Sequence, residues 1–172
     1  SRPSSRLLLR QMVDTPLRCN ARLIALIRCS EARERDGDDT MRVLLVEDDA
    51  WIAGFMKRGL EAEAYYEVDL ASEKAQTLTL SGACAYDTII LDIFLGADDG
   101  LDICRVLRQR SVKTPILIMT AKDSAETRQA SEEAGADAYL PKPFPFEDLL
   151  ATIKRLHGSA ASSDSRQNLQ AG

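Results

Sequence analysis

Short apolar runs alternate with longer amphipathic stretches between residues 41 and 157. Three nearly continuous apolar runs, RVLLV (42–46), TIIL (88–91) and PILIM (115–119), are typical of strands buried on both faces. The segments YEVDLA (66–71) and DAYL (137–140) are weaker strand candidates. Helical periodicity separates the strands, over residues 50–63, 72–81, 100–110, 123–134 and 145–157. Five strands alternating with five helices predict an α/β domain with a parallel sheet covered on both faces.

The two ends of the chain lack this alternation. Residues 1–40 carry eight Arg, no Lys and six acids, and Met41 stands directly before the first strand. This segment is either a targeting peptide, as its Arg and Ser content allows, or an extension upstream of a start at Met41. Its acids favour the extension, so we expect residues 1–40 to lie outside the fold. Residues 158–172 are small and polar, and they predict a tail or the start of a linker.

Composition excludes several classes of protein. The chain is 45% hydrophobic and 28% charged, which is typical of a globular domain and not of a disordered one. Its net charge of −5 argues against direct binding to a nucleic-acid backbone, and no apolar run is long enough to span a membrane. None of the four cysteines forms a C-x-x-C motif, so no disulfide framework is predicted and a reducing, cytoplasmic location is expected. Cys104 is predicted to be a core residue, and the single histidine, His157, a solvated one.

Charged and hydroxyl side chains follow the predicted strands. Glu47 and Asp48 follow the first strand, Asp92 the third, Thr120 the fourth and Lys142 the fifth. In the flavodoxin-like strand order 2-1-3-4-5, a doubly wound sheet binds ligands at the carboxyl ends of its strands. We therefore expect these five side chains to meet in one patch.

Three carboxylates and one lysine leave this patch with excess negative charge. Two like charges about 4 Å apart repel by roughly 4 kcal/mol at an effective dielectric constant near 20. Oxygen ligands of this kind suit Mg²⁺, whose charge with that of Lys142 would make the site neutral and able to accept a phosphoryl group. Any one of these acids could instead be exposed or cap the next helix, and Asp49 is a candidate for that role. The joint pattern favours a functional site.

The segment from Met41 to about Leu156 resembles the receiver domain of bacterial two-component response regulators, and most closely the OmpR class, which carries a winged-helix DNA-binding domain. The matching stretches are MRVLLVEDD, YDTIILDIFLGADDGLDICRVLR, PILIMTAKD and GADAYLPKPF. They cover about two-thirds of the chain, and their mutual spacing fits the family. The resemblance implies a regulatory domain that catalyses its own phosphorylation and dephosphorylation, and is not otherwise an enzyme.

For the phosphorylation chemistry, the resemblance assigns Asp92 as the phosphoacceptor, which takes phosphate from a sensor histidine kinase. Glu47 and Asp48 would bind Mg²⁺ together with Asp92 and the backbone carbonyl of Phe94. Phosphoryl transfer of this kind depends on positioning and on neutralisation of charge.

For the switch, the resemblance implies that Lys142 holds a phosphate oxygen and that Thr120 hydrogen-bonds the phosphoryl group. Tyr139 would turn inward with Thr120, and small Ala121 would leave the site open. The Lys142–Pro143 peptide bond would be cis. The surface formed by the fourth helix, the fifth strand and the fifth helix would then change.

This chain departs from the family in two places. Gly96 stands where the family usually has Pro, which loosens that loop without removing a ligand. Activated OmpR-class receivers pair through three ion pairs between subunits, of which Arg128 with Asp148 is kept. The acid of another pair, Asp137, is kept, but its usual basic partner falls at Ser159, for which Arg155 one turn earlier is the alternative. Both members of the remaining pair are replaced, by Ala138 and Thr152. We expect a homodimer on this surface to be weak.

Several alternatives stay open on sequence alone. The chain either belongs to a longer transcription factor, which would contact DNA only through a further C-terminal domain, or is a stand-alone receiver that acts by protein contact. A pseudo-receiver would keep the fold without phosphorylation, although the complete acidic set argues against it. A flavodoxin-like flavin-binding protein would need a loop rich in glycine and hydroxyls after the first strand, where this chain has VEDDAW. Trp51 in that loop is expected to pack locally and not to recognise a substrate.

Overall fold

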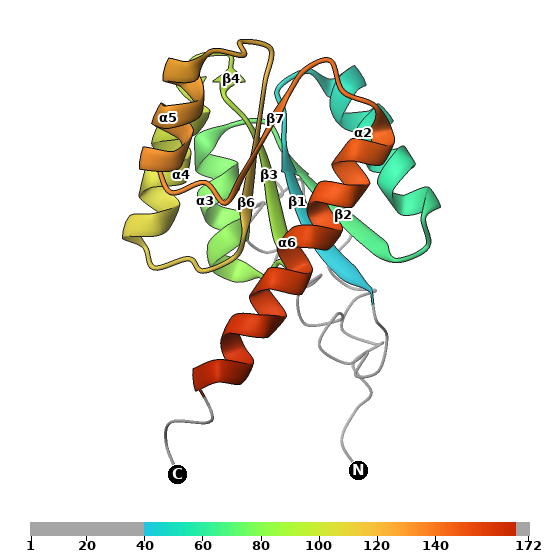
Figure 1. Ribbon diagram of the computed structural model, residues 1–172. Helices are drawn as coiled ribbons and strands as arrows, with labels where there is room; N and C mark the ends of the chain where they lie inside the picture. The colour runs from blue at the N-terminus through green and yellow to red at the C-terminus, as the bar shows by residue number, and fades with distance from the viewer. Residues whose placement is uncertain (1–39, 168–172) are drawn as a thin grey trace, which may run out of the picture.

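The computed structural model describes residues 40–167, with side chains through Gly158 (Figure 1). The interpretations made for residues 1–39, including Cys19 and Cys29, and for the last five residues lie outside the described part of the chain. Within residues 40–167, no helix is long and apolar enough to cross a membrane.

The strands and helices alternate as the apolar pattern predicts. The strands of the main sheet are β1 (Met41–Val46), β2 (Tyr66–Ala71), β3 (Thr88–Asp92), β6 (Ile116–Thr120) and β7 (Ala138–Pro141). The helices are α2 (Ala50–Ala62), α3 (Lys74–Ala83), α4 (Gly100–Gln109), α5 (Ala125–Glu133) and α6 (Phe146–Gln167). Two very short strands, β4 (Phe94–Leu95) and β5 (Asp98–Asp99), form a separate hairpin that the sequence pattern did not predict.

The main sheet is parallel, with the order β2-β1-β3-β6-β7. This is the predicted 2-1-3-4-5 arrangement, because β6 and β7 are the fourth and fifth strands of that sheet. The order places β1 beside β3 and β3 beside β6, so the residues that follow these strands lie at one edge of the sheet. The fold class predicted from the sequence is confirmed.

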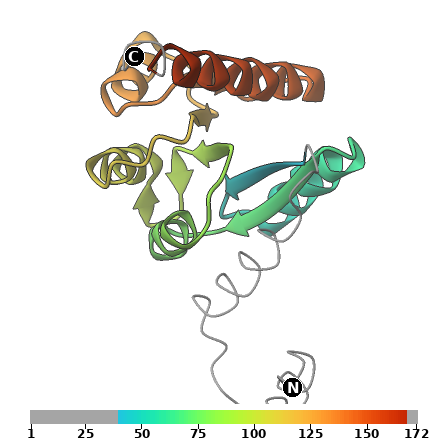
Figure 2. The same cartoon turned by 90° about the horizontal axis from the view of Figure 1, so that it is seen from below.

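Two apolar layers cover the sheet. Helices α2 and α6 pack on one face through residues such as Met56, Leu60 and Leu149. Helices α3 and α4 pack on the other face, where Ile103, Cys104 and Leu107 are fully buried, as predicted for Cys104. Figure 2 shows α6 on one side of the strands and α3 on the other. His157 near the end of this core is exposed, as predicted.

Helix α6 runs ten residues beyond the predicted end at His157, to Gln167, so the expected tail begins as helix. The sequence pattern indicates a stop at Gly158, and the structure contradicts it. A Cβ at Gly158 would meet nothing within 4 Å, and glycine in a helix interior costs only about 1 kcal/mol relative to alanine. A helix already docked on the core through Leu149 and Ile153 can therefore continue past it.

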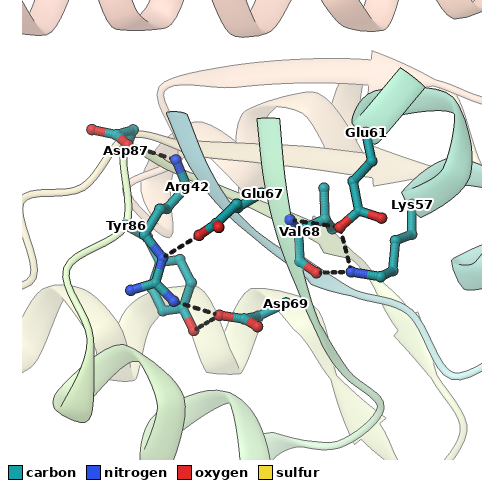
Figure 3. Close-up of polar contacts among 8 residues, drawn as sticks. All are labelled: Arg42, Lys57, Glu61, Glu67, Val68, Asp69, Tyr86 and Asp87. Carbon is teal, nitrogen blue, oxygen red and sulfur yellow. Dashed lines mark hydrogen bonds and ion pairs between the residues drawn. The ribbon is translucent and has the colours of Figure 1, made fainter. Parts of the chain in front are cut away.

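Side chains from the flanking helices reach the outer edge of strand β2 (Figure 3). Lys57 Nζ donates to the carbonyl oxygen of Val68, and the N–H of Val68 donates to Glu61 Oε1 at 3.3 Å. Gln76 Nε2 donates to the carbonyl of Leu70 at 3.3 Å. These main-chain groups point away from β1, because the carbonyls of Tyr65 and Ala71 accept from β1 and its continuation.

A polar cluster closes the amino end of β1 (Figure 3). The Arg42 guanidinium lies 5.4 Å from the centre of the Tyr86 ring and 2.9 Å from Asp69 Oδ2, to which Tyr86 Oη also donates at 2.9 Å. The Arg42 N–H donates to Asp87 Oδ2 at 2.7 Å. Burial, and then the charge of Asp69 and the hydrogen bond to it, raise the pKa of Tyr86 far above its usual value. This cluster lies at the opposite end of the sheet from the predicted patch.

Candidate functional site

Glu47, Asp92 and Lys142 meet at the carboxyl end of the sheet. Lys142 Nζ donates to Glu47 Oε2 at 2.8 Å and to Asp92 Oδ2 at 2.5 Å. The two carboxylate residues are nearly buried, with 4% and 5% of their surface exposed. Glu47 follows β1, Asp92 ends the adjacent strand β3 and Lys142 follows β7, so the strand order places all three at the same end of the sheet and the Lys142 side chain joins them into one triad.

The environment of Glu47 and Lys142 shifts the pKa of each. Burial raises the pKa of Glu47, and the hydrogen bond and charge of Lys142 oppose that rise without cancelling it. Burial would lower the pKa of Lys142, but the hydrogen bonds to Asp92 and Glu47 outweigh it and hold the pKa above its usual value. One ammonium thus faces two buried carboxylates, and the triad has an excess of negative charge.

The loop after β1 orients its acids differently. Asp49 caps α2, because its Oδ1 accepts from the N–H groups of Trp51 at 2.8 Å and Ile52 at 3.0 Å, as predicted. The Asp49 N–H donates to Glu47 Oε1 at 3.3 Å, which steadies the buried glutamate. Asp48 between them is exposed. The Trp51 ring is 73% exposed and stacks on Phe55, so it packs locally and does not fill a pocket.

The β4–β5 hairpin folds back against Asp92. The N–H of Phe94 donates to Asp92 Oδ1 at 3.0 Å, and the N–H of Gly100 donates to the carbonyl of Ile93 at 2.8 Å. A Cβ at Gly100 would stand 2.0 Å from the carbonyl oxygen of Asp92, so only glycine allows this approach. Gly96 in the turn has φ +58°, and a Cβ there would lie 3.4 Å from Asp48 Oδ2. The hairpin turn therefore lies beside the exposed acid.

The two predicted switch residues lie on β6 and β7, and the Thr120 carbonyl accepts from the N–H of Lys142 at 2.7 Å. Thr120 is fully buried at the end of β6, and its Oγ1 accepts from the N–H of Lys122 at 3.1 Å. Tyr139 on β7 is partly exposed, and its Oη donates to the carbonyl of Lys122 at 3.0 Å. The Arg128 guanidinium lies 5.0 Å from the centre of the Tyr139 ring. The structure holds Tyr139 in this outward position, and Ala121 beside the site is exposed.

Two of the three residues assigned to a dimer surface, Asp137 and Arg128, have side-chain partners within the chain. Asp137 Oδ2 accepts from Arg108 Nη2 at 2.6 Å and from the N–H of Ile116 at 2.8 Å. Arg128 Nη2 lies 3.3 Å from Asp123 Oδ1. Asp148 is exposed in the first turn of α6.

Among the side chains of residues 40–158, no three His, Cys, Asp or Glu groups are gathered closely enough to hold a metal ion as they stand. The donor chemistry nevertheless fits Mg²⁺, because the side-chain donors are carboxylate oxygens and two of them are buried with only one lysine to balance them. The Lys142–Pro143 peptide bond that follows is cis, as predicted.

Sequence reasoning missed the residues that fix the hairpin beside Asp92. Asp98 joins it to Lys74 at the start of α3, and Asp98 belongs to no periodic pattern. One signal was available for Gly100, which directly follows the helix-capping residue Asp99, since a glycine inside the first turn of a helix often marks a close approach.

Comparisons with known proteins identify the family of the domain. Residues 43–154 match the model of the response regulator receiver domain. The chain is 38% identical over 129 residues to the response regulator MprA of Mycobacterium leprae, a match that covers 75% of this chain and 56% of that protein. It is 40% identical over 116 residues to MprA of Mycobacterium avium, covering 67% of this chain and 50% of that one.

The solved structure of the Francisella response regulator 1452 receiver domain superposes with a TM-score of 0.67 at 30% identity, over 70% of this chain and 99% of that one. By contrast, the chain spans about half the length of the curated relatives it matches. The match thus covers nearly the whole of the solved receiver domain, and about half of the longer regulators. The chain belongs to the response regulator receiver domain family.

Proposed function

We propose that Asp92 is the phosphoacceptor through which this receiver domain takes its signal from a sensor histidine kinase. The observation that carries this proposal is the double hydrogen bond of Lys142 to Asp92 and Glu47. It aligns a nearly buried carboxylate with a cation able to hold a phosphate oxygen. The donor histidine would come from the partner, so the exposed His157 has no role in the transfer.

Glu47, Asp48, Asp92 and the backbone carbonyl of Phe94 would hold Mg²⁺. Receiver domains are generally magnesium-dependent, and the ion would supply positive charge to neutralise the transferred phosphoryl group. Two nearly buried carboxylates share one lysine, and this supports the assignment. Burial disfavours the ionised form of Glu47, and a bound cation would stabilise that form.

The protein's own part in the transfer is positioning. The Phe94 N–H holds Oδ1 of Asp92, which leaves Oδ2 to attack phosphorus in line with the departing imidazole nitrogen of the donor. A P–O bond forms as the P–N bond breaks, and the imidazole keeps the electron pair. Lys142 would move from Oδ2 of Asp92 to a phosphoryl oxygen, and Thr120 would donate its hydroxyl to another.

The output would follow from that movement of Thr120. Tyr139 would turn from the Lys122 carbonyl into the space that Thr120 leaves, and the surface of α5, β7 and α6 would change. We assign the domain to the cytoplasm and to transcriptional control of the OmpR class, acting through a DNA-binding domain that would follow this segment. A stand-alone receiver acting by protein contact is the alternative.

The experiment is phosphorylation with Mg²⁺ and acetyl phosphate, measured by intact mass. We expect one added phosphoryl group in the parent, none in Asp92→Asn and none after chelation of the metal. Asp99→Asn, which alters an acid in the same segment but outside the triad, is the control and should be labelled like the parent. Labelling of Asp92→Asn to the same extent as the parent would refute the assignment, and an unlabelled parent would indicate a pseudo-receiver.

A further inference from the structure

The hairpin beside Asp92 is too short to hold its own position. Its strands pair only Phe94 with Asp99 and Leu95 with Asp98. Isolated two-stranded hairpins are marginal even when longer, and the glycine in this turn adds freedom where the family usually has proline. The hairpin must therefore be fixed from outside.

Asp98 supplies that attachment to a different helix. Its Oδ2 accepts at 2.8 Å from the N–H of Lys74, the first residue of α3. The residue at the capping position of α3, Glu73, makes no side-chain cap hydrogen bond. The first N–H groups of a helix have no partner within the helix, so a carboxylate supplied from 24 residues away satisfies one of them.

Lys74 extends the connection with its side chain. Its Nζ lies 2.5 Å from Asp102 Oδ2, in the first turn of α4. One residue of α3 is thus bonded to the second strand of the hairpin and to the helix that comes after it. We call the hydrogen bond from the Lys74 N–H to Asp98 the hairpin clamp, and the ion pair of Lys74 with Asp102 lies outside it.

The clamp bears on the proposed metal site through the hairpin turn. Gly96, two residues before Asp98, lies against Asp48, with its Cβ position 3.4 Å from Oδ2. Phe94, whose carbonyl is the proposed main-chain ligand, is in the strand opposite Asp99. A shift of the hairpin would move that carbonyl and the wall beside Asp48 together.

We infer that Asp98 is a positioning residue, which holds the hairpin so that Asp48 and the Phe94 carbonyl face the metal. This inference rests on the proposed function. Asp98 has no contact with the reacting atoms, and it acts through the hydrogen bond to Lys74. The hydrogen bond needs an oxygen acceptor at this position and no charge, so asparagine should replace aspartate.

The test compares Asp98→Ala with Asp98→Asn and with Asp102→Ala, which breaks only the partly exposed ion pair of Lys74. Hydrogen exchange of amides 93–97 is measured without metal, and Mg²⁺ affinity is measured by calorimetry. Asp48→Ala, which removes a proposed ligand, sets the scale for a full loss of binding.

We expect Asp98→Ala to speed exchange at 93–97 and to weaken Mg²⁺ binding about tenfold, at the low end for partners of metal ligands. In Asp98→Asn and Asp102→Ala, the exchange rates at 93–97 and the Mg²⁺ affinity should stay within about twofold of the parent's, since each variant keeps the hydrogen bond to the Lys74 N–H. A lower unfolding midpoint in Asp98→Ala with parental exchange at 93–97 and parental Mg²⁺ affinity would mean a merely structural residue and overturn the inference.

Failure of the proposed function would look different. The parent itself would then neither bind Mg²⁺ nor accept phosphate, while exchange measured without metal would still report on the clamp. Unchanged exchange in Asp98→Ala would overturn the clamp whatever the parent binds.

Discussion

Lys142 carries the balance of charge at the candidate site. It is the only cation hydrogen-bonded to either buried carboxylate among the described side chains, and both bonds are 2.8 Å or shorter. A lysine suits this place because its compact ammonium can leave one oxygen for another as charge arrives. Tyr86 at the opposite end of the sheet is the contrasting case, a buried acid held in its neutral form by burial and by the adjacent Asp69.

Tyr86 predicts a dependence of stability on alkaline pH. Its pKa is raised in the folded chain, so above about pH 10 only the unfolded chain releases the phenolic proton. The free energy of unfolding should then fall as pH rises, by up to about 1.4 kcal/mol per pH unit from this group. Tyr86→Phe should be about 1 kcal/mol less stable at pH 8, because it lacks the hydrogen bond to Asp69. Its free energy of unfolding should fall less than the parent's as pH rises, because it has no phenol at this position.

Urea unfolding of both proteins between pH 8 and pH 11 measures this difference. The difference in the free energy of unfolding between the parent and Tyr86→Phe should become smaller above pH 10. Parallel curves across the whole range would show that the phenol does not titrate differently in the two states.

At the scale of elements, the sequence predicted those that carry their own periodicity. Strands β3 and β6 are fully buried, β1 is buried from Val43 onward, and the weaker candidates β2 and β7 are the two outer strands of the sheet. The β4–β5 hairpin was missed because two-residue strands have no period to detect. The end of α6 was missed because a stop signal such as Gly158 is weak beside a docked helix.

In the candidate site, too, one part could be predicted from the sequence and another could not. Which residues converge could be predicted, because strand order decides which strand ends are neighbours at one edge of the sheet. The bonds of Lys142 to Glu47, of Asp98 to Lys74 and of Arg108 to Asp137 could not, because each joins segments at least 24 residues apart through side-chain geometry. Tertiary distances of that kind leave no local pattern.

Helix α5 is weakly attached and should open before α4. It buries only Ser131, whereas α4 buries five residues. Its first turns are held through Arg128, which lies over the Tyr139 ring. We expect faster amide exchange in α5 than in α4, and a further two- to fivefold increase in Arg128→Ala, because exposed cation–π contacts contribute about 0.5–1 kcal/mol.

Hydrogen exchange followed by mass spectrometry checks this. Arg105→Ala, an exposed arginine on α4, is the control and should leave α5 unchanged. If exchange in α5 did not respond to Arg128→Ala, the contact with Tyr139 would not hold the helix.

At the scale of the whole molecule, the sheet and its five covering helices lie from Met41 onward in the described part of the chain. The described strands of the main sheet and the described members of both apolar layers all lie within residues 41–156. We therefore predict that residues 41–157 fold by themselves.

A chain that begins at Met41 should fold with the parental thermal midpoint and accept phosphate at the parental rate. Calorimetry and the mass assay on both proteins measure this. A midpoint lower by several degrees would show that the first forty residues stabilise the domain, since about 1 kcal/mol shifts the midpoint by a few degrees at this size.

Activated protein should stay mostly monomeric at low micromolar concentration. Exposed ion pairs contribute about 0.2–1 kcal/mol each, and a symmetric dimer counts each pair twice. The missing pairs would weaken association by one or more orders of magnitude, at about 1.4 kcal/mol per order. Arg128 and Asp137 must also leave Asp123 and Arg108 before they can pair across an interface.

Sedimentation of beryllofluoride-treated protein measures this, with Arg128→Glu as the comparison. A tight dimer in the parent that Arg128→Glu disrupts would contradict the prediction. It would mean that the surviving pairs are sufficient for association.

The hydrogen bonds between strand β2 and the side chains of Lys57, Glu61 and Gln76 affect whether the protein aggregates at high concentration. Fibrils grow when a foreign strand adds to a row of free amides and carbonyls at a sheet margin. On β2 the N–H and the carbonyl of Val68 and the carbonyl of Leu70 are occupied, and an arriving strand would have to displace the ion pair of Lys57 with Glu61. Templated aggregation is therefore disfavoured along this margin, which leaves contact between copies to their side chains.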